Sequence, residues 1–128
     1  MESDILYFIS KSGDVCTFEK DWGCTRQRMI CLSEKIYIPM ARILYYRISG
    51  KITEYPHLAC TTQSIRIFAQ EESLKRRMFI FNDISSPIFS NNTISFISRD
   101  QEKQEQSYHY FPVENVISLE NIKKGEDI

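Results

Sequence analysis

The chain has 128 residues, of which 42% are hydrophobic and 26% charged, and its formal net charge is −1. This composition is that of a soluble globular protein of one domain, which excludes disordered, collagen-like and coiled-coil chains. The near-neutral charge argues against a protein that coats nucleic acid over its whole surface, although a local basic face is compatible with it. We expect one globular domain over residues 1–122, followed by a frayed tail over residues 123–128.

The sequence favours an intracellular protein of the cytoplasm or nucleus. The first twenty residues lack the basic start and apolar stretch of a secretory signal, and the apolar run 36–48 is too short for a membrane span. Four cysteines are too few for a disulfide scaffold, which indicates free thiols in a reducing compartment. Only His57 and Cys60 have the close spacing of zinc ligands. We therefore expect no metal, no cofactor and no contact with a membrane.

Strand-forming residues and a turn signal predict a hairpin near the start of the chain. Residues 5–9 are rich in β-branched and aromatic side chains, and residues 15–18 repeat this pattern. Between them, Ser12-Gly13-Asp14 is typical of a turn. Residues 22–31 are ambiguous and predict neither a helix nor a strand.

Residues 33–49 fit two different structures. As a helix, the segment would begin near Ser33, carry Pro39 in its first turn and end at Gly50. As a strand, residues 43–48 are dominated by β-branched and aromatic side chains, and Ser49-Gly50 would turn the chain into a hairpin with residues 51–55. We prefer the hairpin, because the residues after Gly50 continue the strand pattern.

The second half of the chain gives clearer strand signals. Strands are predicted at 64–68, 77–81, 93–98, 107–111 and 116–119. Residues 83–92 have the composition of a loop, because they contain Pro87 and several serines, and we expect Ile88 and Phe89 to be tucked into the core. Residues 112–115 predict a short 3₁₀ turn before the last strand.

These elements predict a mainly β fold, with α+β left open by the ambiguous segment 36–48. Six to eight short strands with at most one or two short helices are typical of a small antiparallel barrel or sandwich. Length and spacing do not separate the two architectures.

No sequence motif indicates an enzyme. The chain contains no nucleophile elbow, no phosphate-binding glycine loop and no zinc-protease signature. His57 follows Tyr55-Pro56 and is interpreted as a turn residue, whereas His109 is interpreted as a solvent-facing residue of a strand. We expect no catalytic residue.

Basic and aromatic residues concentrate in the middle of the chain. Residues 42–77 contain seven basic and three acidic residues, a net charge of +4, whereas residues 100–128 have three basic and seven acidic ones, a net charge of −4. A basic face with stacking rings can bind single-stranded nucleic acid. That is the alternative function, because an ordinary solvated face would have the same composition.

The preferred hypothesis is recognition of a protein partner. Barrels and sandwiches expose edge strands that can pair with a partner strand, and tyrosine and arginine are enriched at binding hot spots. In a strand, one tyrosine of Tyr45-Tyr46 is expected to face away from the core. The candidate contact residues are Tyr45, Tyr46, Arg47, Arg66, Arg76 and Arg77. We therefore predict a non-catalytic adaptor, complex subunit or inhibitor, and self-association is compatible with this function.

Overall fold

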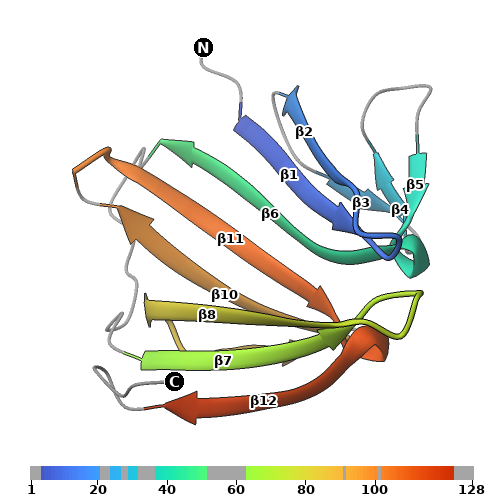
Figure 1. Ribbon diagram of the computed structural model, residues 1–128. Helices are drawn as coiled ribbons and strands as arrows, with labels where there is room; N and C mark the ends of the chain where they lie inside the picture. The colour runs from blue at the N-terminus through green and yellow to red at the C-terminus, as the bar shows by residue number, and fades with distance from the viewer. Residues whose placement is uncertain are drawn as a thin grey trace.

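The described part of the chain consists mostly of β-strands. A computed structural model describes residues 4–20, 24–26, 29–31, 37–51, 63–90, 92–100 and 102–122. The strands are β1 (Asp4–Ser10), β2 (Val15–Lys20), β3 (Cys24–Arg26), β4 (Met29–Cys31), β5 (Tyr37–Pro39), β6 (Ile43–Lys51), β7 (Gln63–Gln70), β8 (Arg76–Ile84), β9 (Ile88–Ser90), β10 (Thr93–Asp100), β11 (Glu105–Pro112) and β12 (Val116–Ile122). Two 3₁₀ turns, η1 (Met40–Arg42) and η2 (Val113–Asn115), precede β6 and β12 (Figure 1).

Nine of the described strands form one antiparallel sheet that folds over on itself. Its order is β12-β7-β8-β10-β11-β6-β1-β2, with β9 paired to β10, and β3, β4 and β5 form a separate small sheet. The junction between β8 and β10 is a single pair, Ile84 with Ser98. Beyond this junction β12-β7-β8 packs against β10-β11-β6-β1, as the contact between the rings of Tyr45 and Phe79 shows (Figure 1).

An aromatic core fills the space between the two halves of the folded sheet. We call the faces that meet here the inner faces. The ring of Phe81 in β8 lies 4.9 Å from that of Phe96 in β10, and Phe79 lies 5.1 Å from Phe111 in β11. Aliphatic residues complete this core, among them Ile9, Ile65, Ile67, Ala69, Ile84 and Ile94. Burial of this apolar surface is the main force that closes the fold.

A second, smaller core covers the opposite, outer face of β1 and β6. Leu6 and Phe8 point to this side, while Tyr7 and Ile9 point to the inner face, because side chains alternate along a strand. Ile38 of β5 packs against the same cluster. This part of the sheet is therefore buried on both faces, which explains why residues 43–46 are all buried and show no alternation.

Most of the predicted elements are confirmed. The N-terminal hairpin, the strands predicted in the second half and the 3₁₀ turn before the last strand are all present. The loop predicted over residues 83–92 is wrong in part, because residues 88–90 form β9. The predicted turn at Ser49-Gly50 is wrong: β6 continues to Lys51, and Gly50 pairs with Gln106 of β11. β6 thus pairs with β1 and β11, two segments distant in sequence, and residues 52–55 lie outside the described residues.

The mainly β class is confirmed, but the sheet does not close into a barrel. β12 and β2, the two ends of the sheet order, have no pairing with each other among the described strands. An open antiparallel sheet folded as a sandwich fits the structure. A helix or a strand was considered for residues 36–48; the described part, 37–48, is strand on both sides of one 3₁₀ turn. No helix in the described part of the chain is long and apolar enough to cross a membrane.

Candidate functional site

Tyr45 and Tyr46, two of the predicted contact residues, are core residues. Each is only 2% exposed. Tyr45 points to the inner face, where its ring lies 4.7 Å from that of Phe111, and Tyr46 points to the outer face, where it stacks on Tyr110 at 4.6 Å. The expectation that one of the pair faces away from the core is wrong, because at this point the sheet has a core on each side.

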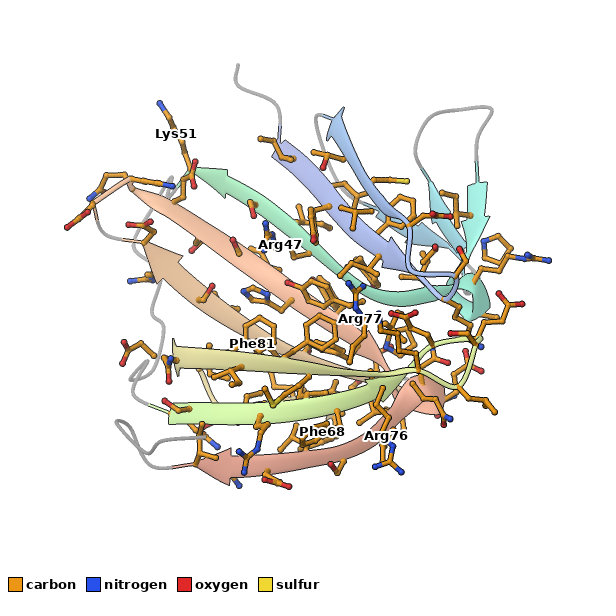
Figure 2. All side chains as sticks on the ribbon, in the orientation of Figure 1. Arg47, Lys51, Phe68, Arg76, Arg77 and Phe81 are labelled. Carbon is orange, nitrogen blue, oxygen red and sulfur yellow. The ribbon has the colours of Figure 1, made fainter. Side chains whose placement is uncertain are left out.

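The candidate arginines of β7 and β8 do not form one basic face. Arg66 lies on the outer face of β7, and its Nε donates to the Glu120 carboxylate at 3.0 Å. Arg77 lies near the start of β8 and on its inner face. Its Nε is 3.1 Å from the buried carboxylate of Glu71. Of these three arginines, only Arg76, at the start of β8, is exposed. Figure 2 shows its side chain turned away from that of Arg77. Two of these three cations are therefore neutralised within the protein.

A buried histidine joins three strands of the inner face. The Tyr45 hydroxyl lies 2.7 Å from Nδ1 of His109, and the Ser98 hydroxyl lies 2.7 Å from Nε2. Burial lowers the pKa of His109 to about 4, and the nearby positive charge of Arg47 adds to this effect. Burial also raises the pKa of Tyr45 to about 12. The interpretation of His109 as a solvent-facing residue is wrong, since it is only 4% exposed.

This network is suited to holding strands together rather than to catalysis. A serine beside an imidazole resembles a nucleophile with its base, but a base must accept a proton and be stabilised when charged. Here Nδ1 faces a neutral tyrosine hydroxyl, and the low pKa of His109 disfavours the imidazolium. The two hydroxyls satisfy both ring nitrogens of a neutral imidazole, because a hydroxyl can donate or accept.

The clearest surface feature is a pair of apolar side chains on β9. Ile88 is 61% exposed and Phe89 is 66% exposed. The expectation that both are tucked into the core is wrong, because β9 is an edge strand whose only partner among the described strands is β10. The sequence holds a signal that this expectation overlooked: residues 84–98 contain no charged side chain. Exposed edge strands are normally protected by charges.

Half-buried Ile97 and Tyr110 and exposed Tyr108 extend this feature over the outer face of β10 and β11. Ile88 is opposite Ser95, which is opposite Tyr110, so the three share the outer face. In the neighbouring row, Tyr108 lies between Ile97 of β10 and Ile48 of β6. We use the name β9 surface for Ile88, Ile97, Tyr108 and Tyr110 on the outer face together with Phe89, which points to the opposite side of β9.

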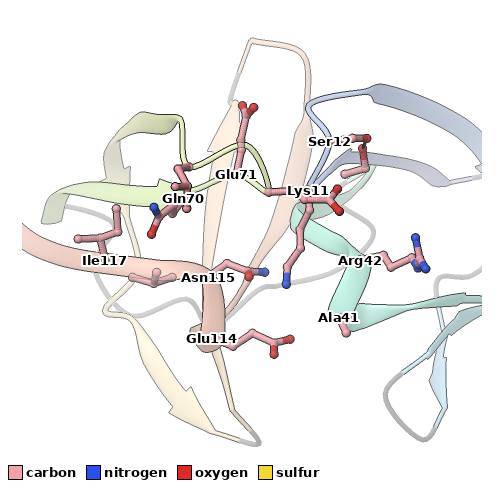
Figure 3. A pocket seen from close by; sticks show the side chains of 13 residues that line it. Lys11, Ser12, Ala41, Arg42, Gln70, Glu71, Glu114, Asn115 and Ile117 are labelled. Carbon is pink, nitrogen blue, oxygen red and sulfur yellow. Dashed lines mark hydrogen bonds between the residues drawn. The ribbon is translucent and has the colours of Figure 1, made fainter.

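A pocket of about 560 Å³ lies where four turns meet at one end of the sandwich. Backbone hydrogen bonds fix these turns: Lys11 donates to the carbonyl of Arg42 at 3.0 Å and accepts from the amide of Glu72 at 2.9 Å. Lys11 and Glu114 point into the pocket from opposite sides (Figure 3). Because the lining carries both signs of charge, it favours neither an anion nor a cation.

Among the described residues, the remaining chemistry-bearing side chains form no metal site. No group of three or more His, Cys, Asp or Glu side chains that could hold a metal is found in the described residues. Cys16 is a free, half-buried thiol. His57 and Cys60, the pair with the spacing of metal ligands, lie outside the part of the chain that the structure describes.

Comparison with known proteins adds no assignment. The chain matches no protein-family model, no curated protein sequence and no solved structure.

Proposed function

We propose that this protein is a non-catalytic protein-interaction module that binds an extended, uncharged segment of a protein partner along β9. The observation that carries this proposal is the exposure of Ile88 and Phe89 on an edge strand inside a stretch of fifteen residues, 84–98, without charge.

The backbone of β9 offers hydrogen-bonding groups to a partner strand. β9 pairs with β10 on one side, and a strand added on the other side would extend the same ladder. Its side chains would alternate between Ile88 on the outer face and Phe89 on the side of Ile94. Main-chain bonds would then supply affinity, and the two apolar residues would select apolar side chains in the partner.

The neighbouring tyrosines support a protein as the partner. Tyr110 lies across Ser95 from Ile88 on the same face, and Tyr108 lies in the next row of β11; their hydroxyls can form polar contacts at the rim of an apolar interface. A contact of this composition buries apolar area without leaving an uncompensated charge.

Single-stranded nucleic acid is the alternative ligand, and the charges favour it less. Phosphate binding requires free cations beside the stacking rings, but residues 84–98 carry none. Arg66 and Arg77, which were candidates for this role, form ion pairs with Glu120 and Glu71.

The test is selection of binding peptides from a random library against the purified protein. We expect the selected peptides to be uncharged and rich in β-branched and aromatic residues. Their affinity should be lost in Phe89→Asp and retained in the control Met78→Asp, which changes an apolar residue of β8 that is 49% exposed.

Three outcomes would overturn the proposal. One is equal binding of the selected peptides to Phe89→Asp and to the unmodified protein. Another is saturable binding of an oligothymidylate that weakens steeply with salt while no peptide is selected, which would favour nucleic acid. The third is a dimer in sedimentation that Phe89→Asp dissociates, because β9 would then be covered by a second copy of the chain.

A further inference from the structure

Arg47 lies on the inner face of β6, midway along the strand (Figure 2). Its guanidinium carbon is 4.3 Å from the centre of the Tyr7 ring, which is a cation–π contact. The side chain is half-buried, and its charge acts on Tyr45 and His109. Arg47 is thus held in place by aromatic neighbours.

No carboxylate among the described residues neutralises Arg47. Arg66 and Arg77 differ from Arg47 in this respect, because each of them forms an ion pair with a glutamate. Withdrawing a cation from water without a counter-ion is unfavourable. A guanidinium that is fixed, partly desolvated and without a described counter-ion is suited to bind an anion from solution.

A pocket of about 340 Å³ lies beside Arg47. It is lined by Ile5, Tyr7, Thr17, Arg47, Ser49, Gly50, Lys51 and Glu105. This volume is at the lower end of the range for small-molecule sites. Ile5 and the Tyr7 ring supply apolar lining, and Lys51, at the end of β6 (Figure 2), also lines the pocket. Its described lining carries two cations and one carboxylate.

We propose that this pocket binds a small organic monocarboxylate. The carboxylate would accept two parallel hydrogen bonds from the guanidinium of Arg47, which presents its donors as a planar fork. The apolar part of the ligand would lie against Ile5 and Tyr7. The described lining residues, in which Glu105 is opposite Lys51, carry one positive charge in excess, which suits a monoanion better than a phosphate dianion. The site is on the inner face, separate from the β9 surface.

The test is titration of the ¹⁵N-labelled protein with benzoate, followed by NMR. We expect saturable shifts of the Arg47 side-chain Nε–H signal and of the Thr17 and Ser49 amide signals. Arg47→Gln should weaken binding at least about tenfold. Arg66→Gln, a matched loss of an arginine from the outer face of the sheet, should leave the affinity unchanged.

A second variant, Thr17→Trp, tests the pocket even if Arg47→Gln does not fold. Thr17 is exposed and lines the pocket, so Thr17→Trp should fill the space while leaving Arg47 in place. Loss of benzoate binding in Thr17→Trp supports the site. The proposal is overturned if benzoate shifts no signal at the pocket, if inorganic phosphate binds more tightly than benzoate, or if Thr17→Trp binds benzoate as tightly as the unmodified protein.

Discussion

The hydroxyl oxygen of Tyr45 and Nδ1 of His109 lie 2.7 Å apart, inside the core and 64 positions apart in the sequence. Together with the bond from Nε2 to Ser98, this contact links β6, β11 and β10 through one imidazole. A polar group in such a place is stabilising only while every partner is present, because an unpaired polar atom in the core is unfavourable.

The neutral state of His109 makes the stability of the protein depend on pH. The pKa of His109 is about 4 in the folded protein, below the ordinary value of 6.5. As the pH falls below 6.5 the unfolded state binds a proton and the folded state does not, so stability falls between about pH 6.5 and pH 4. We expect a loss of about 2 kcal/mol between pH 7 and pH 5 from this group. Urea unfolding at both pH values measures it.

The control is His109→Gln, which keeps a hydrogen-bonding side chain but does not titrate. Its stability should change less between pH 7 and pH 5 than that of the unmodified protein. An equal pH dependence in both proteins would contradict a role for His109.

Tyr45→Phe should destabilise the fold more than Tyr46→Phe. Both rings are buried, but the hydroxyl of Tyr45 pairs with Nδ1 of His109, whereas that of Tyr46 has no hydrogen bond with a described residue. Loss of the Tyr45 hydroxyl leaves a buried nitrogen unpaired, which we expect to lower the free energy of unfolding by about 1–3 kcal/mol. Chemical denaturation of the two variants compares them, and equal effects would argue against the network.

Gly13→Ala should be destabilising because of both backbone and space. Gly13 has a φ of +95°, a conformation that L-residues rarely adopt, and an added Cβ would lie 3.2 Å from Oε1 of Glu71. We expect a loss of about 1–2 kcal/mol. Gly50→Ala is the comparison, since Gly50 lies in β6 and has no positive φ. Thermal unfolding gives the order, and a larger loss in Gly50→Ala would contradict the argument.

Phe89→Ser should leave stability nearly unchanged, although it removes a large apolar side chain. Phe89 is 66% exposed, while Ile94, directly opposite in β10, is 3% exposed. We expect a change within about 0.5 kcal/mol for Phe89→Ser and a loss of about 2–5 kcal/mol for Ile94→Ser. If Phe89→Ser were as damaging as Ile94→Ser, the side chain would be part of the core and the β9 surface would not exist.

The local alternation of apolar and polar residues predicted the positions of strands well, but it predicted poorly which side chains are exposed to solvent. The alternation at residues 64–68 and 93–98 identifies both strands, and their inward residues are indeed buried. The same rule failed at Tyr45 and Tyr46, because it assumes that one face of a strand is exposed to solvent. At Ile88 and Phe89 a different assumption failed: apolar residues of a predicted loop were expected to be buried, although Ile88 and Phe89 are exposed.

The sequence by itself determined the mainly β class and the location of most strands, because alternation and turn residues act over a few neighbouring positions. The tertiary structure alone decided that Gly50 continues a strand, since its partner Gln106 lies far along the chain. It also decided that His109 is buried between two hydroxyls, that Arg47 has no described counter-ion and that β9 is an edge. Each of these depends on which distant segments pack together, and long-range packing leaves no local pattern in the sequence.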